Sequence, residues 1–99
     1  MPAVTRKGDY NTGHGLFPPV ALTGGSPNVF INSKPCGRRG DSYPPHSDPY
    51  TTHSGSISGG SPNVFVNGLP IARVNDAVSC GGSVAQGSPN VFANNKKEV

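Results

Sequence analysis

The residues of this chain best suited to chemistry are its three histidines and one cysteine, and all four lie in loops of a repeated unit. His53 and Cys80 each stand seven residues before the glycine that opens a repeated hexapeptide. His14 stands eleven residues before such a glycine, which requires an insertion of four residues, and it follows an aspartate by five residues, as His46 does. Thiolate and imidazole together form a ligand set that suits zinc. We therefore predict one closed, structural zinc site built from His14, His46, His53 and Cys80.

Two short motifs recur along the chain and define the unit that must position these ligands. The hexapeptide Gly-Ser-Pro-Asn-Val-Phe occurs three times, at 25–30, 60–65 and 87–92. A second motif, Arg-x-Gly/Asn-Asp, also occurs three times, at 6–9, 38–41 and 73–76. A period near 30 residues indicates one structural unit built three times. The aspartates of the second motif are expected to cap turns through backbone N–H groups, and they are not a catalytic dyad because each belongs to a separate unit.

Length and composition favour one small all-β domain spanning residues 1–99, with no fused effector domain. Hydrophobic residues make up only 32% of the chain, so a metal is expected to supplement a thin core. The 14 glycines and 11 prolines fall at fixed repeat positions and disfavour helix. The N-terminus lacks the apolar segment of a Sec signal peptide, and no window is apolar enough to span a membrane. Synthesis in the cytoplasm, where thiols stay reduced, is the expectation.

The charges make no case for nucleic-acid binding. Eight basic and five acidic residues give a net charge of +3, and the basic residues form short pairs rather than a basic helix or run. We expect the pairs at 6–7, 38–39 and 96–97 to belong to a solvated face.

Each hexapeptide is predicted to open a hairpin. Residues 63–67 alternate, with Val64 and Val66 on one face and Phe65 with two asparagines on the other. Asn67-Gly68 is a strong two-residue turn signal, and 69–74 reads as the return strand. The first copy repeats this plan with strands at 28–32 and 34–39. Cys36 is interpreted as a small strand residue and not as a ligand.

The third copy lacks a return strand, and the chain begins with a return strand that lacks a partner. We predict that 90–93 pairs with 3–6 and closes a ring of three units. Loops of unequal length, at 9–25, 41–60 and 76–87, connect the units. The three hexapeptide strands then occupy equivalent positions in the ring, and the pattern leaves open whether the valine row or the Phe-Asn row of each strand is covered.

These motifs resemble those of the PAAR-repeat proteins, named for Pro-Ala-Ala-Arg. The corresponding residues here are Pro70-Ile71-Ala72-Arg73 and, more divergently, Pro35-Cys36-Gly37-Arg38. The resemblance covers nearly the whole chain, including the Cys-Gly-Gly at 80–82. Departures are Asn75 and Ser33, each where the family usually has glycine, and both are expected to weaken turn geometry.

The resemblance implies a small conical β-structure with pseudo-threefold symmetry and one zinc ion near its apex. It implies a structural, non-enzymatic tip protein that caps a trimeric VgrG-type spike, one monomer per trimer, sharpens it for membrane piercing and carries effector cargo. Such a protein would be secreted by type VI secretion into or onto the target cell, without stable membrane insertion. The alternative in the same mechanics is the tip of a contractile bacteriophage tail spike.

Two other classes of protein fit these residues less well than the spike cap. A zinc hydrolase needs an open coordination position and a general base, whereas four protein ligands close the site and no His-Glu-x-x-His motif occurs. A zinc-dependent nucleic-acid module would require salt-sensitive binding.

Overall fold

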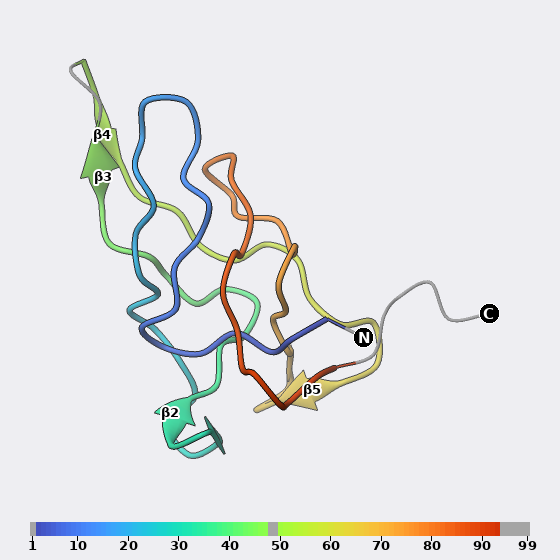
Figure 1. Ribbon diagram of the computed structural model, residues 1–99. Helices are drawn as coiled ribbons and strands as arrows, with labels where there is room; N and C mark the ends of the chain where they lie inside the picture. Colours follow the sequence, from blue (N-terminus) through green and yellow to red (C-terminus); the bar gives the residue numbers. More distant parts are fainter. Residues whose placement is uncertain (1, 48–49, 94–99) are drawn as a thin grey trace.

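The computed structural model describes residues 2–47 and 50–93, which form three two-stranded antiparallel hairpins and no helix (Figure 1). The first pairs β1 (Phe30–Ile31) with β2 (Lys34–Pro35). The second pairs β3 (His46–Ser47) with β4 (Thr52–His53), and the third pairs β5 (Phe65–Val66) with β6 (Leu69–Pro70). The predicted all-β fold is thus confirmed, and within the described residues no segment could cross a membrane as a helix.

The turns of the two hexapeptide hairpins adopt the predicted conformation. Asn67 and Gly68 have φ values of 55° and 78°, and Asn32 and Ser33 have φ values of 54° and 68°. Two successive positive φ values define the type I′ turn that matches the twist of a hairpin. Ser33 therefore occupies a left-handed conformation that costs a non-glycine residue free energy. Asn75, the other departure from glycine, also has a positive φ, of 80°.

The ladders are shorter than the predicted strands at 28–32, 34–39, 63–67 and 69–74, because each return segment leaves its hairpin after the proline. Three residues at equivalent positions then form a closed triangle of backbone hydrogen bonds. The N–H of Thr5 donates to Ala72 (3.1 Å), that of Ala72 to Gly37 (3.1 Å), and that of Gly37 to Thr5 (2.9 Å). A Cβ on Gly37 would lie 2.6 Å from a methyl carbon of Thr5, so this position requires glycine. The triangle joins all three units at the centre of the fold.

The two ends of the chain complete the third unit, as predicted. Ala3 is bridged to Phe92 in antiparallel orientation. The N–H of Val4 donates to the carbonyl of Val91 (3.0 Å), and that of Ala93 donates to Pro2 (3.1 Å). The repeat is therefore closed into a ring, which leaves this hexapeptide strand paired rather than as an open edge.

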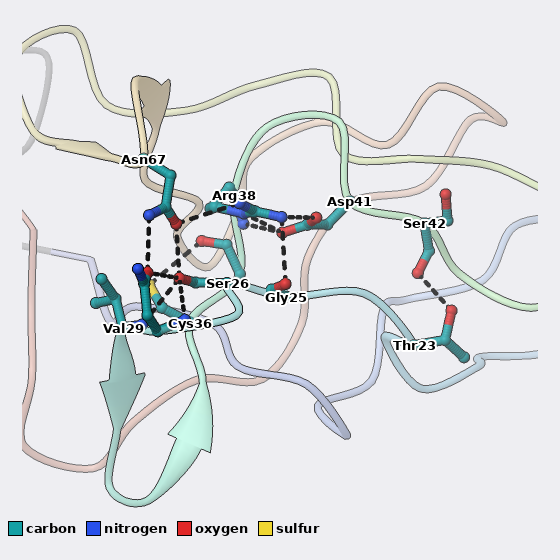
Figure 2. A network of polar contacts seen from close by, with 11 residues as sticks. Thr23, Gly25, Ser26, Val29, Cys36, Arg38, Asp41, Ser42 and Asn67 are labelled. Carbon is teal, nitrogen blue, oxygen red and sulfur yellow. Dashed lines mark hydrogen bonds and ion pairs between the residues drawn. The ribbon is translucent and has the colours of Figure 1, made fainter.

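Asparagine side chains fasten the turns of the β1–β2 and β5–β6 hairpins to neighbouring units. Asn67, from the β5–β6 turn, accepts a hydrogen bond from Ser26 (2.6 Å) and donates one to Asn28 (2.8 Å) of the first unit (Figure 2). Asn32, from the β1–β2 turn, makes the same pair of contacts with Ser88 (2.6 Å) and Asn90 (3.0 Å) of the third unit. The hairpins are thus held side by side at one end of the molecule.

The expectation that Arg6 and Arg38, the first residues of their basic pairs, lie on a solvated face is wrong, and Arg73 of the same motif is buried as well. Each arginine forms an ion pair with the aspartate three residues later, at 2.9 Å for Arg6, 2.9 Å for Arg38 and 3.0 Å for Arg73. The arginine side chains are only 10%, 15% and 4% exposed, respectively. Hydrogen bonding to Asp9 raises the pKa of Arg6, and Asp41 does the same for Arg38. The exposed neighbours Lys7 and Arg39 are the solvated members of the first two pairs, and the pair at 96–97 lies outside the described residues.

The aspartates also cap their turns, as predicted. A carboxylate oxygen of Asp76 accepts the backbone N–H of Arg73 at 2.7 Å, and Asp9 and Asp41 accept the equivalent N–H groups at 2.9 and 2.7 Å. The same carboxylates bind the guanidinium groups, so each aspartate fixes both the backbone and the side chain of its arginine.

The core consists of two small clusters, one on each side of the central triangle. The cluster toward the β1–β2 and β5–β6 hairpins contains Val4, Cys36, Val66, Ile71 and Ala93. The cluster toward the loops contains Leu22, Tyr43, Ile57, Ala72, Val78 and Val84. Burial, and secondarily the charge of Asp41, raises the pKa of the Cys36 thiol to about 11, which agrees with its interpretation as a structural residue.

Candidate metal centre

Two of the predicted ligands face each other across a short ladder. The segment at 41–60, expected to be a loop, contains the β3–β4 hairpin, in which His46 and His53 are directly paired (Figure 1). Directly opposed residues of an antiparallel pair carry their side chains on the same face at close range. Their Nε2 atoms are accordingly 2.9 Å apart. The hairpin therefore contributes two donors.

The other two ligands reach the same point from separate loops. The Nε2 atom of His14 lies 3.0 Å from Nε2 of His53, and the Sγ atom of Cys80 lies 3.8 Å from Nε2 of His46. All four donor atoms lie within 4.8 Å of one another. His46 is buried, and the other three are half-buried. All four predicted residues are brought together and could hold a metal ion.

The structure also settles which repeat positions correspond. His14 follows Asp9 by five residues, as His46 follows Asp41, and both histidines begin a short antiparallel pairing. His14 is therefore the counterpart of His46, and the alignment of His14 with His53 and Cys80 through a four-residue insertion is wrong.

The donor geometry fits a cation better than a set of hydrogen bonds. Nε2 of His53 lies within 3.0 Å of two other Nε2 atoms. A single proton can bridge only one such pair, whereas a cation at the centre satisfies every lone pair directed at it. In a tetrahedral zinc site with Zn–N bonds of about 2.0–2.1 Å, nitrogen donors are separated by about 3.3 Å. The two Nε2–Nε2 separations of 2.9 and 3.0 Å need only a small expansion to reach that value.

The carbonyl of Pro18 sets the tautomer of His46. It lies 2.9 Å from the Nδ1 atom, so Nδ1 donates its proton there and Nε2 presents a lone pair to the centre. This contact was missed at the sequence level, because a backbone carbonyl carries no signature of its residue type.

Two positions beside the ligands require glycine, Gly55 because of close approach and Gly81 because of its backbone conformation. A Cβ on Gly55 would lie 2.8 Å from Sγ of Cys80, and Gly81 has a φ of +127° beside the ring of His14. The Cys-Gly-Gly pattern pointed to Gly81, but nothing in the sequence singled out Gly55.

Beneath the centre, burial and then the charges of Asp9 and Cys80 raise the pKa of the Tyr43 hydroxyl.

Comparison with known protein families agrees with this architecture. The family model of the PAAR motif matches residues 46–99, more than half of the chain. The chain belongs to the PAAR motif family. A search of curated proteins found no matching relative.

The structure gives a physical reason for each residue of the second PAAR copy, Pro70-Ile71-Ala72-Arg73. Pro70 ends β6, and Ile71 is buried in the core toward the hairpins. Ala72 belongs to the central triangle and is fully buried, so a larger side chain would have no space there. Arg73 forms the buried ion pair with Asp76. The motif thus carries the chain from a hairpin, through the centre, to the base of a loop.

Proposed function

We propose that this PAAR protein caps the tip of a trimeric VgrG-type spike, one monomer per trimer. It would be made in the cytoplasm, travel to the target cell on the spike through type VI secretion and carry effector cargo. Its role is mechanical, and no catalytic step is assigned to it. The observation that carries the proposal is a set of three exposed phenylalanines, one from each unit, at the end of the molecule that holds the β1–β2 and β5–β6 hairpins.

The three phenylalanines occupy the last position of each hexapeptide. Phe30, Phe65 and Phe92 are 50%, 56% and 51% exposed. The valine row is turned inward instead, with Val66 only 7% exposed. The face available for docking is therefore the Phe-Asn row. Three large apolar side chains in equivalent environments match a partner that offers the same pocket three times, and a C3-symmetric trimer does so.

The asparagine contacts support this face. Asn32 and Asn67 bond to neighbouring units, so the strands that carry Phe30 and Phe65 are fixed before any partner arrives. A preorganised face loses little conformational entropy on binding. The closed ring also allows a single chain to end a trimeric spike without exposing strand edges.

The test is complex formation with the VgrG-type spike protein of the same genome, measured by native mass spectrometry. The wild type should form a complex of one monomer and three spike chains. Phe30, Phe65 and Phe92 replaced together by serine should abolish it, while Leu16→Ser, which changes a side chain 69% exposed at the loop end, should not. Equal binding by both variants would refute docking through this face. Absence of any complex with the wild type would refute the proposed partner.

We further propose that the centre binds one structural zinc ion. Three imidazoles and one thiolate are donors that zinc prefers, and four protein ligands leave a tetrahedral ion no open position. Zinc would join the three segments that carry its ligands, which are far apart in the sequence. Its function there is cohesion of the loops and not catalysis.

Elemental analysis combined with native mass spectrometry tests the zinc proposal. We expect one zinc per chain, weakened by alanine at each of His14, His46, His53 and Cys80. A different metal, or zinc that is indifferent to one of these substitutions, would refute the four-ligand zinc site.

A further inference from the structure

The segment 14–18 carries more of the metal centre than its single ligand. His14 and Phe17 exchange both backbone hydrogen bonds, at 3.0 and 2.8 Å. Gly15 follows His14 with a φ of +53°, as the first position of a type II′ turn requires. Gly13 before it has a φ of +66°, and a Cβ there would lie 2.5 Å from the carbonyl oxygen of Phe17. The backbone therefore holds Phe17 in a fixed position relative to the ligand.

The ring of Phe17 contacts all three imidazoles. Its centroid lies 4.8 Å from that of His14, 5.0 Å from that of His46 and 4.1 Å from that of His53. These are distances at which aromatic pairs attract one another. Phe17 belongs to neither hydrophobic cluster among the described residues. Its packing is directed at the ligands rather than at the core.

The same segment also orients a ligand of another loop. Pro18, next to Phe17, accepts the Nδ1 proton of His46 at 2.9 Å. The five consecutive residues 14–18 thus supply one candidate metal ligand, a ring that contacts all three imidazoles, and the carbonyl that selects the tautomer of His46. An imidazole leaves a metal by rotating away from it, and a ring packed against it hinders that rotation.

We propose that Phe17 is a positioning residue that retains the metal by holding the three imidazoles in their donor orientation. The inference rests on the proposed zinc site. Residues that orient metal ligands typically alter affinity by about 10–100-fold, and we expect a change of that order in the rate of zinc release when the ring is removed. Phe17→Leu, which keeps apolar bulk but not the aromatic ring, should have a smaller effect.

Zinc release is measured by mixing the zinc-loaded protein with excess chromogenic chelator. Phe17→Ala should release zinc about tenfold or more faster than the wild type. Leu16→Ala is the matched control, because this neighbour lies in the same turn with its side chain 69% exposed. Its release rate should equal that of the wild type. Unchanged release from Phe17→Ala would overturn the inference.

A second measurement separates positioning from general stability. In the zinc-loaded protein, the aromatic ring current of Phe17 should shift the ring-proton resonances of His53, whose centroid is 4.1 Å away, and Phe17→Leu should remove that shift. Absence of the shift in the wild type would overturn the inference. Wild-type protein that binds no zinc would refute the zinc proposal itself, whereas tight zinc binding with indifference to Phe17 would refute only the positioning role.

Discussion

The buried ion pairs lead to a quantitative prediction about stability. Replacing Asp76 by asparagine removes the charge that compensates Arg73, whose side chain is only 4% exposed. The carboxylate accepts the backbone N–H of Arg73 at 2.7 Å and its Nε and Nη2 groups at 3.2 and 3.0 Å. Asparagine keeps only one acceptor oxygen, so the substitution leaves a buried guanidinium with neither its counter-charge nor its full set of acceptors.

Breaking a buried ion pair by removing one partner costs about 3–5 kcal/mol. Because asparagine retains one acceptor, we expect the lower limit, a loss of about 3 kcal/mol in the free energy of unfolding. For a domain of this size that corresponds to a fall in melting temperature of about 12–24 °C. The loss is a large part of the total stability of a small domain, which is about 5–15 kcal/mol.

The assay is urea unfolding of wild type and variant at one fixed zinc concentration. The repeat supplies two internal replicates, Asp9→Asn and Asp41→Asn, whose arginine side chains are 10% and 15% exposed. The losses should fall in the order Asp76, Asp9, Asp41, since the uncompensated charge is progressively better solvated. Arg39→Gln, at an exposed position, should change stability by no more than about 0.5 kcal/mol.

A loss below about 1 kcal/mol for Asp76→Asn, which is the range of exposed ion pairs, would refute this reasoning. So would a loss equal to that of Arg39→Gln. A double substitution that removes both charges but keeps an acceptor for the backbone N–H of Arg73, Arg73→Met with Asp76→Asn, should recover part of the loss, because no unpaired charge then remains buried.

Three further predictions concern single positions. Ser33→Gly should stabilise the protein by about 0.5–1 kcal/mol in thermal unfolding, because it removes the strain of a φ of 68° at some cost in chain entropy. The Cys36 thiol should make the free energy of unfolding fall as pH rises between its ordinary pKa of 9.0 and its folded pKa of about 11, because the unfolded chain loses the thiol proton first. In this pH window the urea midpoint of Cys36→Ala should fall less than that of the wild type. Gly55→Ala should weaken zinc binding by about tenfold or more in chelator competition, because its Cβ would lie 2.8 Å from Sγ of Cys80, whereas Ser54→Ala, at an exposed position, should not.

The features that could be predicted from the sequence are those with local causes. Asn67-Gly68 specifies its turn by the backbone conformation of two residues, and the alternation around Phe65 separates two faces of the strand, of which the structure buries Val66 and exposes Phe65. Ring closure between Ala3 and Phe92 was also predictable, because the repeat made the missing half of the third unit visible.

The features that escaped prediction depend on contacts distant in the sequence or on the backbone alone. Arg73 looks like a surface residue until the fold places it beside Asp76 in a buried turn. The pairing of His46 with His53 gave no alternation of apolar and polar residues to reveal a ladder. The Pro18 carbonyl and the clearance at Gly55 depend on how separate loops meet, and no residue type encodes that.

The metal centre explains why the threefold symmetry ends at the loops. A symmetric arrangement of three loops offers donors in multiples of three, whereas a tetrahedral ion needs four. Two positions of each unit face the centre. The first lies five residues after the aspartate of the second motif (Asp9, Asp41 or Asp76), and the second lies four residues before a buried core residue (Leu22, Ile57 or Val84). The six residues at these positions are His14, His46, Gly81, Pro18, His53 and Cys80. Four of them are donors, contributed as one, two and one by the three units.

The two positions without a donor side chain have separate uses. Gly81 adopts a φ of +127°, which favours glycine, where the backbone passes the ring of His14, and Pro18 supplies the carbonyl that orients His46. At the opposite end Phe30, Phe65 and Phe92 have nearly equal exposure, and the proposed trimeric partner would favour such an unchanged repeat. Unequal loops at one end and equal strands at the other are therefore what one chain would need to bind both the proposed metal ion and the proposed threefold partner.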